Sequence, residues 1–203
     1  MIRDESTLNL LVDTVSSFVK EKLLPIELEV SESDHIPEEI VEQMKELGMF
    51  GLSIPEEYDG IGLTFEEEVH VIMALCYASP VFRSIIGTNV GLGSIGIVLD
   101  GTEEQKKKYL PKIASGEYRA SYALTEPDSG SDAASLRTTA KREGDYYIIN
   151  GTKRFITNAS EADLFTVFAR SNPERKKHQG ISAFLVERGT PGLIVGKPEK
   201  KMG

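Results

Sequence analysis

The sequence predicts an α+β protein, with an all-α helical domain over residues 1–117 followed by an antiparallel β domain over residues 118–203. Two observations support this prediction. Up to Gly116, apolar residues recur at helical spacing and capping signals precede them. Beyond Gly116, apolar and polar residues alternate in short runs that turn residues separate, which is typical of antiparallel strands. A chain of 203 residues is long enough for two small domains, each with its own core.

Charge and cysteine content exclude several classes of function. The net charge of -9 and the pI near 5.0 disfavour nonspecific binding to nucleic acid or to anionic membranes. Cys76 is the only cysteine, so the chain has no internal disulfide and no cysteine-based metal site. The N-terminus is charged where a secretory signal is apolar, and no stretch approaches the roughly 20 apolar residues of a membrane span. We therefore expect a soluble protein in a reducing compartment, either the cytoplasm or the mitochondrial matrix.

The first two helices follow from apolar spacing and from prolines. A first amphipathic helix is predicted from about Asp4 to Leu24, ended by Pro25. Its apolar stripe consists of Leu8, Leu11, Val12, Val15, Phe18 and Val19. Pro37 is expected to open a second helix, and Gly48 to close it.

Capping boxes and prolines mark the remaining helices. Thr64 and Glu67 form a capping box for a third helix that runs to about Ala78. A fourth helix is predicted from Pro80 to Leu99, and it should be buried because it is apolar nearly all round. Thr102 and Gln105 form a second capping box, and Pro111 is expected to begin a further turn.

The fourth helix contains Gly91-Leu92-Gly93-Ser94-Ile95-Gly96, which satisfies the G-x-G-x-x-G pattern of dinucleotide-binding loops. Glu117 lies at about the offset of a ribose-binding acid. The apolar strand that should precede such a loop is missing, and the helix that should follow it breaks at Gly101. We therefore do not expect a dinucleotide site here.

Five alternating segments predict the rest of the β domain. The segments 136–142 and 146–157 are joined through Glu143-Gly144-Asp145, which is a hairpin signal. Further strands are predicted over residues 164–170, 181–187 and 193–196. No histidine is predicted to bind a metal, because His35, His70 and His178 have no partner ligand at a suitable spacing.

Residues 122–132, reading YALTEPDSGSD, begin as a strand and end as a loop of glycine and hydroxyl residues. Pro127 biases the preceding residue away from helix. Ser129, Gly130 and Ser131 combine backbone N–H groups and hydroxyls with little bulk, which suits close approach to a polar ring or a phosphate. On spacing alone, a plain turn is the more common explanation of such a loop. A second segment, residues 155–158 reading FITN, ends the next hairpin with another aromatic and hydroxyl pair.

Together the two segments resemble those of the acyl-CoA dehydrogenase family. In that family, the segments Tyr-x-x-Thr-Glu-Pro-x-x-Gly-Ser-Asp and Trp-Ile-Thr bind the isoalloxazine ring of FAD. This sequence departs from the pattern at Phe155, where tryptophan is usual; phenylalanine keeps the stacking face and loses only the indole N–H. The resemblance spans the N-terminal and middle domains of the family. It implies that the β domain is incomplete here, and that the C-terminal helical bundle, which carries the catalytic carboxylate, is absent from this sequence.

The resemblance implies the site residues, and none of them is a catalytic base. Glu126 is expected to accept backbone hydrogen bonds, and Asp132 to brace the loop. The residues implied to contact FAD are Tyr122, Leu124, Thr125, Gly130, Ser131, Phe155, Ile156 and Thr157. Those implied to contact the acyl-CoA are Ser131, Arg83 and Ser84.

Arg83 places a charged guanidinium at the start of an apolar helix, where an unpaired charge is costly. One explanation is that it reaches solvent or pairs with a nearby carboxylate. The alternative is that Arg83 and Ser84 match the pair with which glutaryl-CoA dehydrogenases, which this chain resembles, hold the far carboxylate of their substrate. Cys76 stands where those enzymes carry a glutamate. We expect a short or medium acyl chain, ending in an acidic group if Arg83 points into the acyl pocket.

The reaction that the resemblance implies is α,β-dehydrogenation of an acyl-CoA thioester, with FAD as cofactor and electron-transfer flavoprotein as electron acceptor. Two alternatives remain: a flavin-dependent monooxygenase or oxidase of the same fold, and a non-catalytic fragment completed by another chain. The full-length protein is expected to be a homo-oligomer, as homotetramers are usual in the family. The 203-residue chain alone is expected to be inactive.

Overall fold

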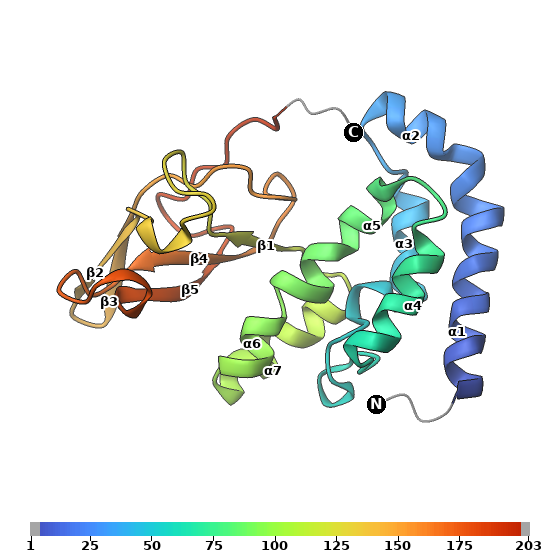
Figure 1. Ribbon diagram of the computed structural model, residues 1–203, viewed down its shortest axis with the longest axis horizontal. Coiled ribbons are helices and arrows are strands. Elements are labelled where there is room, and N and C mark those ends of the chain that lie inside the picture. Colours follow the sequence, from blue (N-terminus) through green and yellow to red (C-terminus); the bar gives the residue numbers. More distant parts are fainter. Residues whose placement is uncertain (1–4, 200–203) are drawn as a thin grey trace. The chain divides into compact units, whose positions relative to one another are not determined.

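The structure is a computed structural model that describes residues 5–199. These residues divide into two compact units, with the boundary between Tyr118 and Arg119. Figure 1 shows that the first unit consists of helices and that the second contains the sheet. The predicted α+β class, with the helices first, is confirmed.

The helical unit begins with one long, uninterrupted run of helical turns. Helix α1 (Glu5–Phe18) continues through a π-helical turn (Val19–Leu23) and a 3-10 turn (Leu24–Ile26) into α2 (Glu27–Ser33). The predicted end at Pro25 is therefore wrong. Pro25 lies at the start of the 3-10 turn, where the missing N–H of proline leaves no intrahelical bond unmade. The run ends instead at Asp34, which adopts a left-handed conformation with φ of 54°.

Helices α3 and α4 begin where the sequence predicts. Pro37 is the N-cap of α3 (Glu38–Glu46). Gly48, with φ of +70°, follows that helix, and a Cβ at this position would lie 2.9 Å from Cδ1 of Ile61. Helix α4 (Phe65–Leu75) has the predicted capping box, in which the Thr64 and Glu67 side chains each accept a hydrogen bond from the backbone N–H of the other residue.

The predicted fourth helix is three segments rather than one. Helix α5 (Pro80–Gly87) passes into a π-helical turn (Thr88–Leu92), and α6 (Ile95–Asp100) follows after a short break. The extra residue of the π turn changes the helical register. Phe82 and Ile86 are buried, but the prediction of complete burial is wrong for the second half, where Leu92, Ile95 and Leu99 are 52%, 45% and 70% exposed.

Helix α7 (Glu103–Ala114) has the second predicted capping box, formed by Thr102 and Gln105. Pro111 lies inside this helix and does not begin a new one. The buried Asn89 amide donates hydrogen bonds to the Ile113 carbonyl at 3.0 Å and to the Tyr118 carbonyl at 2.7 Å. It thereby joins the π turn to the C-terminal end of α7.

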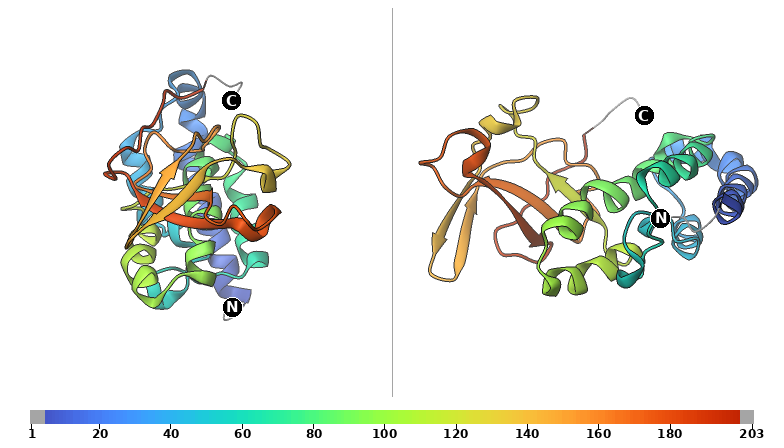
Figure 2. Two further views of the ribbon diagram at one scale, coloured as in Figure 1. Left: turned by 90° about the vertical axis from the view of Figure 1, so that its left-hand side faces the viewer. Right: turned by 60° about the horizontal axis from the view of Figure 1, so that its bottom comes forward.

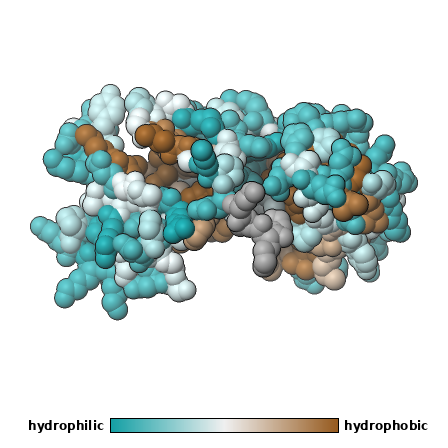
Figure 3. All heavy atoms as spheres, turned by 90° about the horizontal axis from the view of Figure 1, so that it is seen from above, coloured by the Kyte–Doolittle hydropathy of each residue, from teal (hydrophilic) through white to brown (hydrophobic). Residues whose placement is uncertain are grey.

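A large cluster of buried apolar side chains lies among the helices of the helical unit. Helix α1 packs along α4, and α4 along α5 (Figure 1). Fully buried side chains from several elements fill the space between them and supply most of the burial free energy; they include Leu23, Met44, Phe50, Leu75, Phe82 and Ile86. On the face that Figure 3 draws, patches of apolar side chains lie among hydrophilic ones in both units.

One segment of this unit corrects the expectation that no stretch approaches the length and apolar character of a membrane span. Residues Pro80–Asp100 are long and apolar enough to cross a membrane. Half of the segment is nevertheless buried inside the helical unit, as in the core helix of many proteins. Its composition is therefore weak evidence for a membrane span.

The β unit is a five-stranded sheet in which one strand pairs with three other strands. The strands are β1 (Ala120–Ala123), β2 (Thr139–Glu143), β3 (Tyr146–Asn150), β4 (Leu164–Arg170) and β5 (Ile181–Glu187). Strand β4 pairs with β1, with β5 and, through a single residue pair, with β2. The hairpin of β2 and β3 diverges from β4 and β5, as Figure 2 shows.

The sheet is mixed, which corrects the predicted antiparallel arrangement. The β2–β3 and β4–β5 pairs are antiparallel as predicted. Strand β4 runs parallel to β1 and, at Thr139 and Arg170, to β2. Residues 124–163, which separate β1 from β4, form a connection long enough for the crossover that a parallel pair requires.

Some predicted strand ends also differ from the structure. Strand β3 stops at Asn150, after which a Cβ on Gly151 would lie 2.3 Å from Oγ1 of Thr138. Residues 193–196 form no strand. Instead, Leu193 and Val195 pack against the buried cluster of Ala123, Ala162, Phe165 and Val167, while Ile194 is 89% exposed.

Candidate functional site

The loop that follows β1 is closed by its own backbone. The N–H of Glu126 donates to the Ser129 carbonyl at 2.9 Å, and the N–H of Ser129 donates to the Glu126 carbonyl at 3.3 Å. The Ser129 hydroxyl donates to the Asp132 carbonyl at 2.7 Å, and the Asp132 carboxylate accepts a hydrogen bond from the Ser135 hydroxyl. The predicted bracing role of Asp132 is confirmed. Ser131 stays exposed.

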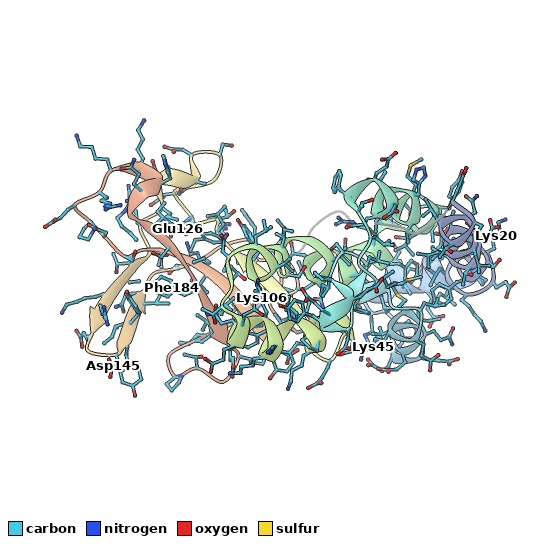
Figure 4. All side chains as sticks on the ribbon, turned by 90° about the horizontal axis from the view of Figure 1, so that it is seen from below. Lys20, Lys45, Lys106, Glu126, Asp145 and Phe184 are labelled. Carbon is cyan, nitrogen blue, oxygen red and sulfur yellow. The ribbon has the colours of Figure 1, made fainter. Side chains whose placement is uncertain are left out.

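Glu126 is a buried anchor for this loop and not an exposed base. Its side chain accepts hydrogen bonds from the backbone N–H groups of Arg137 at 2.6 Å and Thr138 at 2.9 Å, and from the Thr138 hydroxyl. Lys153 Nζ lies 2.8 Å from Glu126 Oε1. Burial raises the pKa of the Glu126 carboxyl, but these hydrogen bonds outweigh it and lower the pKa to about 2. The prediction that Glu126 accepts backbone hydrogen bonds is confirmed; Figure 4 labels this residue.

The second predicted segment lies beside the first. The N–H of Arg154 donates to the Thr125 carbonyl at 2.9 Å. The Ser121 hydroxyl donates to the Thr157 carbonyl at 2.7 Å, which joins β1 to the same segment. The structure thus joins the end of β1 and Thr125 to the segment 154–157, whereas Phe155, Ile156 and Thr157 are not among the residues that line the hollow beside Ser131.

Phe155 occupies an unusual backbone conformation in this segment. Its φ is +58°, which costs energy for a residue with a bulky side chain. The ring is 63% exposed, and the Arg154 guanidinium lies 4.5 Å from the ring centroid. One aromatic face is therefore covered by a cation from the preceding residue. Ile156 is half-buried, and Thr157 is exposed.

An open hollow of about 470 Å³ lies next to the first segment. Tyr122 and Leu124 from the end of β1 line it, and so does Ser131. The remaining lining residues are Asp132, Ala133, Ala134, Phe168, His178 and Ile181. The Tyr122 ring centroid lies 4.8 Å from that of Phe168, and burial raises the pKa of the Tyr122 hydroxyl.

Phe168, His178 and Lys153 are the residues that sequence reasoning missed. Phe168 stands on β4, and the predicted antiparallel sheet gave no reason to place it beside Tyr122. His178 has no role in the sequence analysis beyond the statement that it binds no metal, but it lines the hollow. Lys153 had no local signal, because its partner Glu126 lies 27 residues earlier.

Arg83 and Ser84 belong to the helical unit, and both are exposed. The Arg83 guanidinium lies over Gly87, where a Cβ would be 2.5 Å from Nη1. Burial raises the pKa of the nearby Glu68 carboxyl, while a hydrogen bond with Ser53 and the charge of Arg83 oppose this rise. The guanidinium therefore reaches solvent and has an acidic neighbour.

The side chains present fit the ring and hydroxyl chemistry of a flavin. Tyr122 and Phe155 offer aromatic faces, while Thr125 and Thr157 offer hydroxyls near two adjoining backbone segments. Gly130 is exposed, and a Cβ there would meet nothing within 4 Å, so a ligand can approach its backbone closely. Among residues 5–199, no group of three or more metal-ligating side chains is found.

The sequence and the fold of this chain are both similar to those of known proteins. The family profile described as acyl-CoA dehydrogenase, N-terminal domain, matches residues 5–117, and the profile of the middle domain matches residues 121–203. An acyl-CoA dehydrogenase of Bacillus subtilis is 40% identical over 189 residues, which cover 93% of this chain and 50% of the relative. The chain therefore spans about half the length of this curated relative.

Three solved structures share the fold. A chain from work on the electron transferring flavoprotein of Acidaminococcus fermentans superposes with a TM-score of 0.92 at 37% identity, over 100% of this chain and 53% of that one. The glutaryl-coenzyme A dehydrogenase complex with glutaryl-CoA superposes with a TM-score of 0.91 at 34% identity, over 98% of this chain and 51% of that one. An acyl-CoA dehydrogenase from Bacillus anthracis complexed with FAD superposes with a TM-score of 0.86 at 38% identity, over 99% of this chain and 34% of that one. The predicted resemblance is confirmed, and the chain belongs to the acyl-CoA dehydrogenase family, whose N-terminal and middle domains its matched residues represent.

Proposed function

We propose that this chain is the flavin-binding portion of an FAD-dependent acyl-CoA dehydrogenase that introduces an α,β double bond into an acyl-CoA thioester. The observation that supports this proposal most directly is the hydrogen bond between Arg154 N–H and the Thr125 carbonyl. It brings the two segments of the family resemblance side by side in one unit. The FAD complex of the Bacillus anthracis relative is consistent with the same cofactor here.

We propose the following division of roles among the site residues. Thr125, Thr157 and the backbone N–H groups near them hold the polar edge of the isoalloxazine ring, and Tyr122 and Phe155 flank it. Gly130 and Ser131, with Leu124 and Ile156, complete the contacts with the cofactor. When bound, FAD would supply the hydride acceptor for the β-carbon of the substrate. The protein has to keep that position dry and the ring correctly oriented.

The proposal assigns no catalytic base to this chain. Glu126 directly follows Thr125 in the first segment, but its four hydrogen-bond donors and its pKa of about 2 make it a poor proton acceptor. The 203-residue chain should therefore show no turnover with acyl-CoA and an artificial electron acceptor. Turnover above the buffer control would contradict this assignment.

The experiment that tests the cofactor assignment is a titration of the chain with FAD, followed by flavin absorbance. Binding to the chain alone is expected to be weak. Tyr122→Ala should weaken it further, because it removes an aromatic wall of the proposed site. Tyr146→Ala is the matched control, since Tyr146 is 78% exposed on the β2–β3 hairpin. The cofactor assignment is wrong if Tyr122→Ala and Tyr146→Ala have the same effect in the protein that carries the remaining domain.

For the substrate, we propose an acyl-CoA that Ser131 contacts. We propose separately that Arg83 and Ser84 determine which acyl chains the full-length enzyme prefers. The test is the ratio of kcat/KM for glutaryl-CoA to that for hexanoyl-CoA in the full-length enzyme. Arg83→Ala should lower this ratio at least about tenfold if the guanidinium pairs with a terminal carboxylate. Lys20→Ala, an exposed cation of the same unit, is the control. An unchanged ratio would make Arg83 a structural partner of Glu68.

We also propose electron-transfer flavoprotein as the electron acceptor and a homo-oligomer as the full-length state. The similarity to a chain studied with such a flavoprotein supports the first part. Anaerobic reduction by an acyl-CoA, followed by exposure to air, separates this function from an oxidase. The reduced flavin of an oxidase would be reoxidised rapidly by oxygen, whereas the reduced flavin of a dehydrogenase should react slowly with oxygen and be reoxidised by its protein acceptor.

A further inference from the structure

Lys153 lies at the junction of the two segments assigned to the flavin. Its Nζ donates hydrogen bonds to the Leu124 carbonyl at 3.0 Å and to Glu126 Oε1 at 2.8 Å. The Lys153 and Glu126 side chains are only 11% and 5% exposed. Lys153 itself precedes Phe155 by two residues. One ammonium group therefore joins the start of the second segment to the backbone and to the anchor of the first.

We propose that Lys153 is a positioning residue that holds the two proposed flavin-contact segments in their relative register, an inference that rests on the proposed function. Its ammonium group does not need to touch the cofactor, since its bonds to Leu124 and Glu126 are internal to the protein. It acts through Thr125, which lies between those two partners, and through Phe155. A shift of either segment would separate the hydroxyl and aromatic groups that face the flavin.

Removal of the Lys153 ammonium group should be costly, so this group should hold the two segments firmly. A buried carboxylate that loses its cationic partner is left with an uncompensated charge, which is far more costly than the loss of an exposed ion pair. Because the same Nζ also donates to the carbonyl of the half-buried Leu124, its removal takes one donor from the buried Glu126 carboxylate and one from that carbonyl. The hydrogen bond from Arg154 N–H to Thr125 then has to hold the segments with less support.

The deciding measurement is amide hydrogen exchange in the 203-residue chain without FAD. Lys153→Met keeps the length of the side chain and removes its charge. We expect exchange to accelerate at least about tenfold in both segments, residues 122–132 and 154–158, while helix α7 stays at the wild-type rate. Lys141→Met is the matched control, because Lys141 is 78% exposed in its ion pair with Glu143, and it should change neither segment.

A second variant separates positioning from simple charge balance. Lys153→Met combined with Glu126→Gln has no unpaired buried charge, and it also keeps a folded chain available if the single variant does not fold. We expect it to recover protection at residues 126–138 while residues 154–158 stay at least about tenfold faster than wild type. Recovery of wild-type protection at residues 154–158 as well as at residues 126–138 would overturn the proposal, because Lys153 would then only neutralise Glu126.

An FAD titration adds a functional measurement, and its result can distinguish failure of the proposed cofactor binding from failure of the role proposed for Lys153. In the protein with its remaining domain, the dissociation constant for FAD should rise at least about tenfold in both Lys153 variants and stay unchanged in Lys141→Met. If the wild type binds no FAD, the proposed function fails, while the exchange rates still decide whether Lys153 couples the segments. An unchanged dissociation constant in a variant with accelerated exchange would refute the positioning role toward the cofactor.

Discussion

The buried carboxylate of Glu126 should make the stability of the β unit depend on pH in the acid range. Its pKa is about 2 in the folded protein, against an ordinary value of 4.5. A depressed folded pKa means that the stabilisation is present above about pH 4.5 and is lost as the pH falls through about 2. Since each pKa unit corresponds to about 1.4 kcal/mol, the contribution to the free energy of unfolding is at most about 3.5 kcal/mol at neutral pH.

The measurement needs a probe that reports on the β unit alone. The chain contains no tryptophan, so Phe155→Trp would provide a single fluorescent reporter there. In that background, we compare the free energies of unfolding of the parent and of Glu126→Gln by denaturant titration. The stability advantage of the parent over Glu126→Gln should shrink by up to about 2 kcal/mol between about pH 6 and about pH 3, because the folded carboxyl has a pKa of about 2 and the unfolded one a pKa of 4.5.

The comparison is designed so that other carboxylates cancel. Acid lowers the stability of both proteins through the remaining acidic groups, but only the parent carries the Glu126 titration. Glu143→Gln, a change at the exposed hairpin, is carried through the same titrations as the control. If the difference between parent and Glu126→Gln is the same at both pH values, the hydrogen bonds do not hold the carboxylate ionised and the reasoning is refuted.

Three further changes test the helical unit, each followed by far-UV circular dichroism during thermal unfolding. Gly60→Ala should cost about 3 kcal/mol, because its Cβ would lie 1.9 Å from the Ile54 carbonyl oxygen, whereas Gly91→Ala, with open space around it, should change stability by less than about 1 kcal/mol. Thr102→Ala should cost about 1 kcal/mol through the lost cap of α7. Asn89→Ala should cost about 2 kcal/mol, since the Ile113 and Tyr118 carbonyls each lose the hydrogen bond that the buried Asn89 amide donates; losses no larger than that of Gly91→Ala would contradict the corresponding contact.

Local chemistry explains what the sequence predicts correctly. The capping boxes at Thr64 and Thr102 depend on residues three apart, and the β2–β3 hairpin depends on a turn at Gly144 with φ of +63°. The π turn at Thr88–Leu92 could not be read in this way. It is fixed by distant partners, since the Asn89 side chain bonds the far end of α7 and the Ser53 hydroxyl bonds the Val90 carbonyl.

In the candidate site, too, the features fixed by short local motifs are predictable from the sequence, and those fixed by distant contacts are not. The glycine and hydroxyl loop, the aromatic partner segment and the passive role of Glu126 are visible in the sequence, because each rests on a short motif. Lys153 is not visible, since a lysine after a strand is usually solvated. Its burial becomes apparent only when the fold brings residues 124–126 beside it.

The parallel pairing of β1 with β4, which the sequence did not predict, is what creates the hollow. In this register Tyr122 pairs with Thr166, so that Phe168, two residues further along β4, reaches the Tyr122 ring. The carboxyl ends of two parallel strands lie at one edge of a sheet, and the hydroxyl loop leaves β1 at this edge. At the end of β4, the Arg170 guanidinium donates to the Ala134 carbonyl at 2.8 Å and to the Lys177 carbonyl at 3.1 Å. Strand β4 therefore supplies one wall of the hollow and joins the two turns, residues 133–135 and 177–180, that border it.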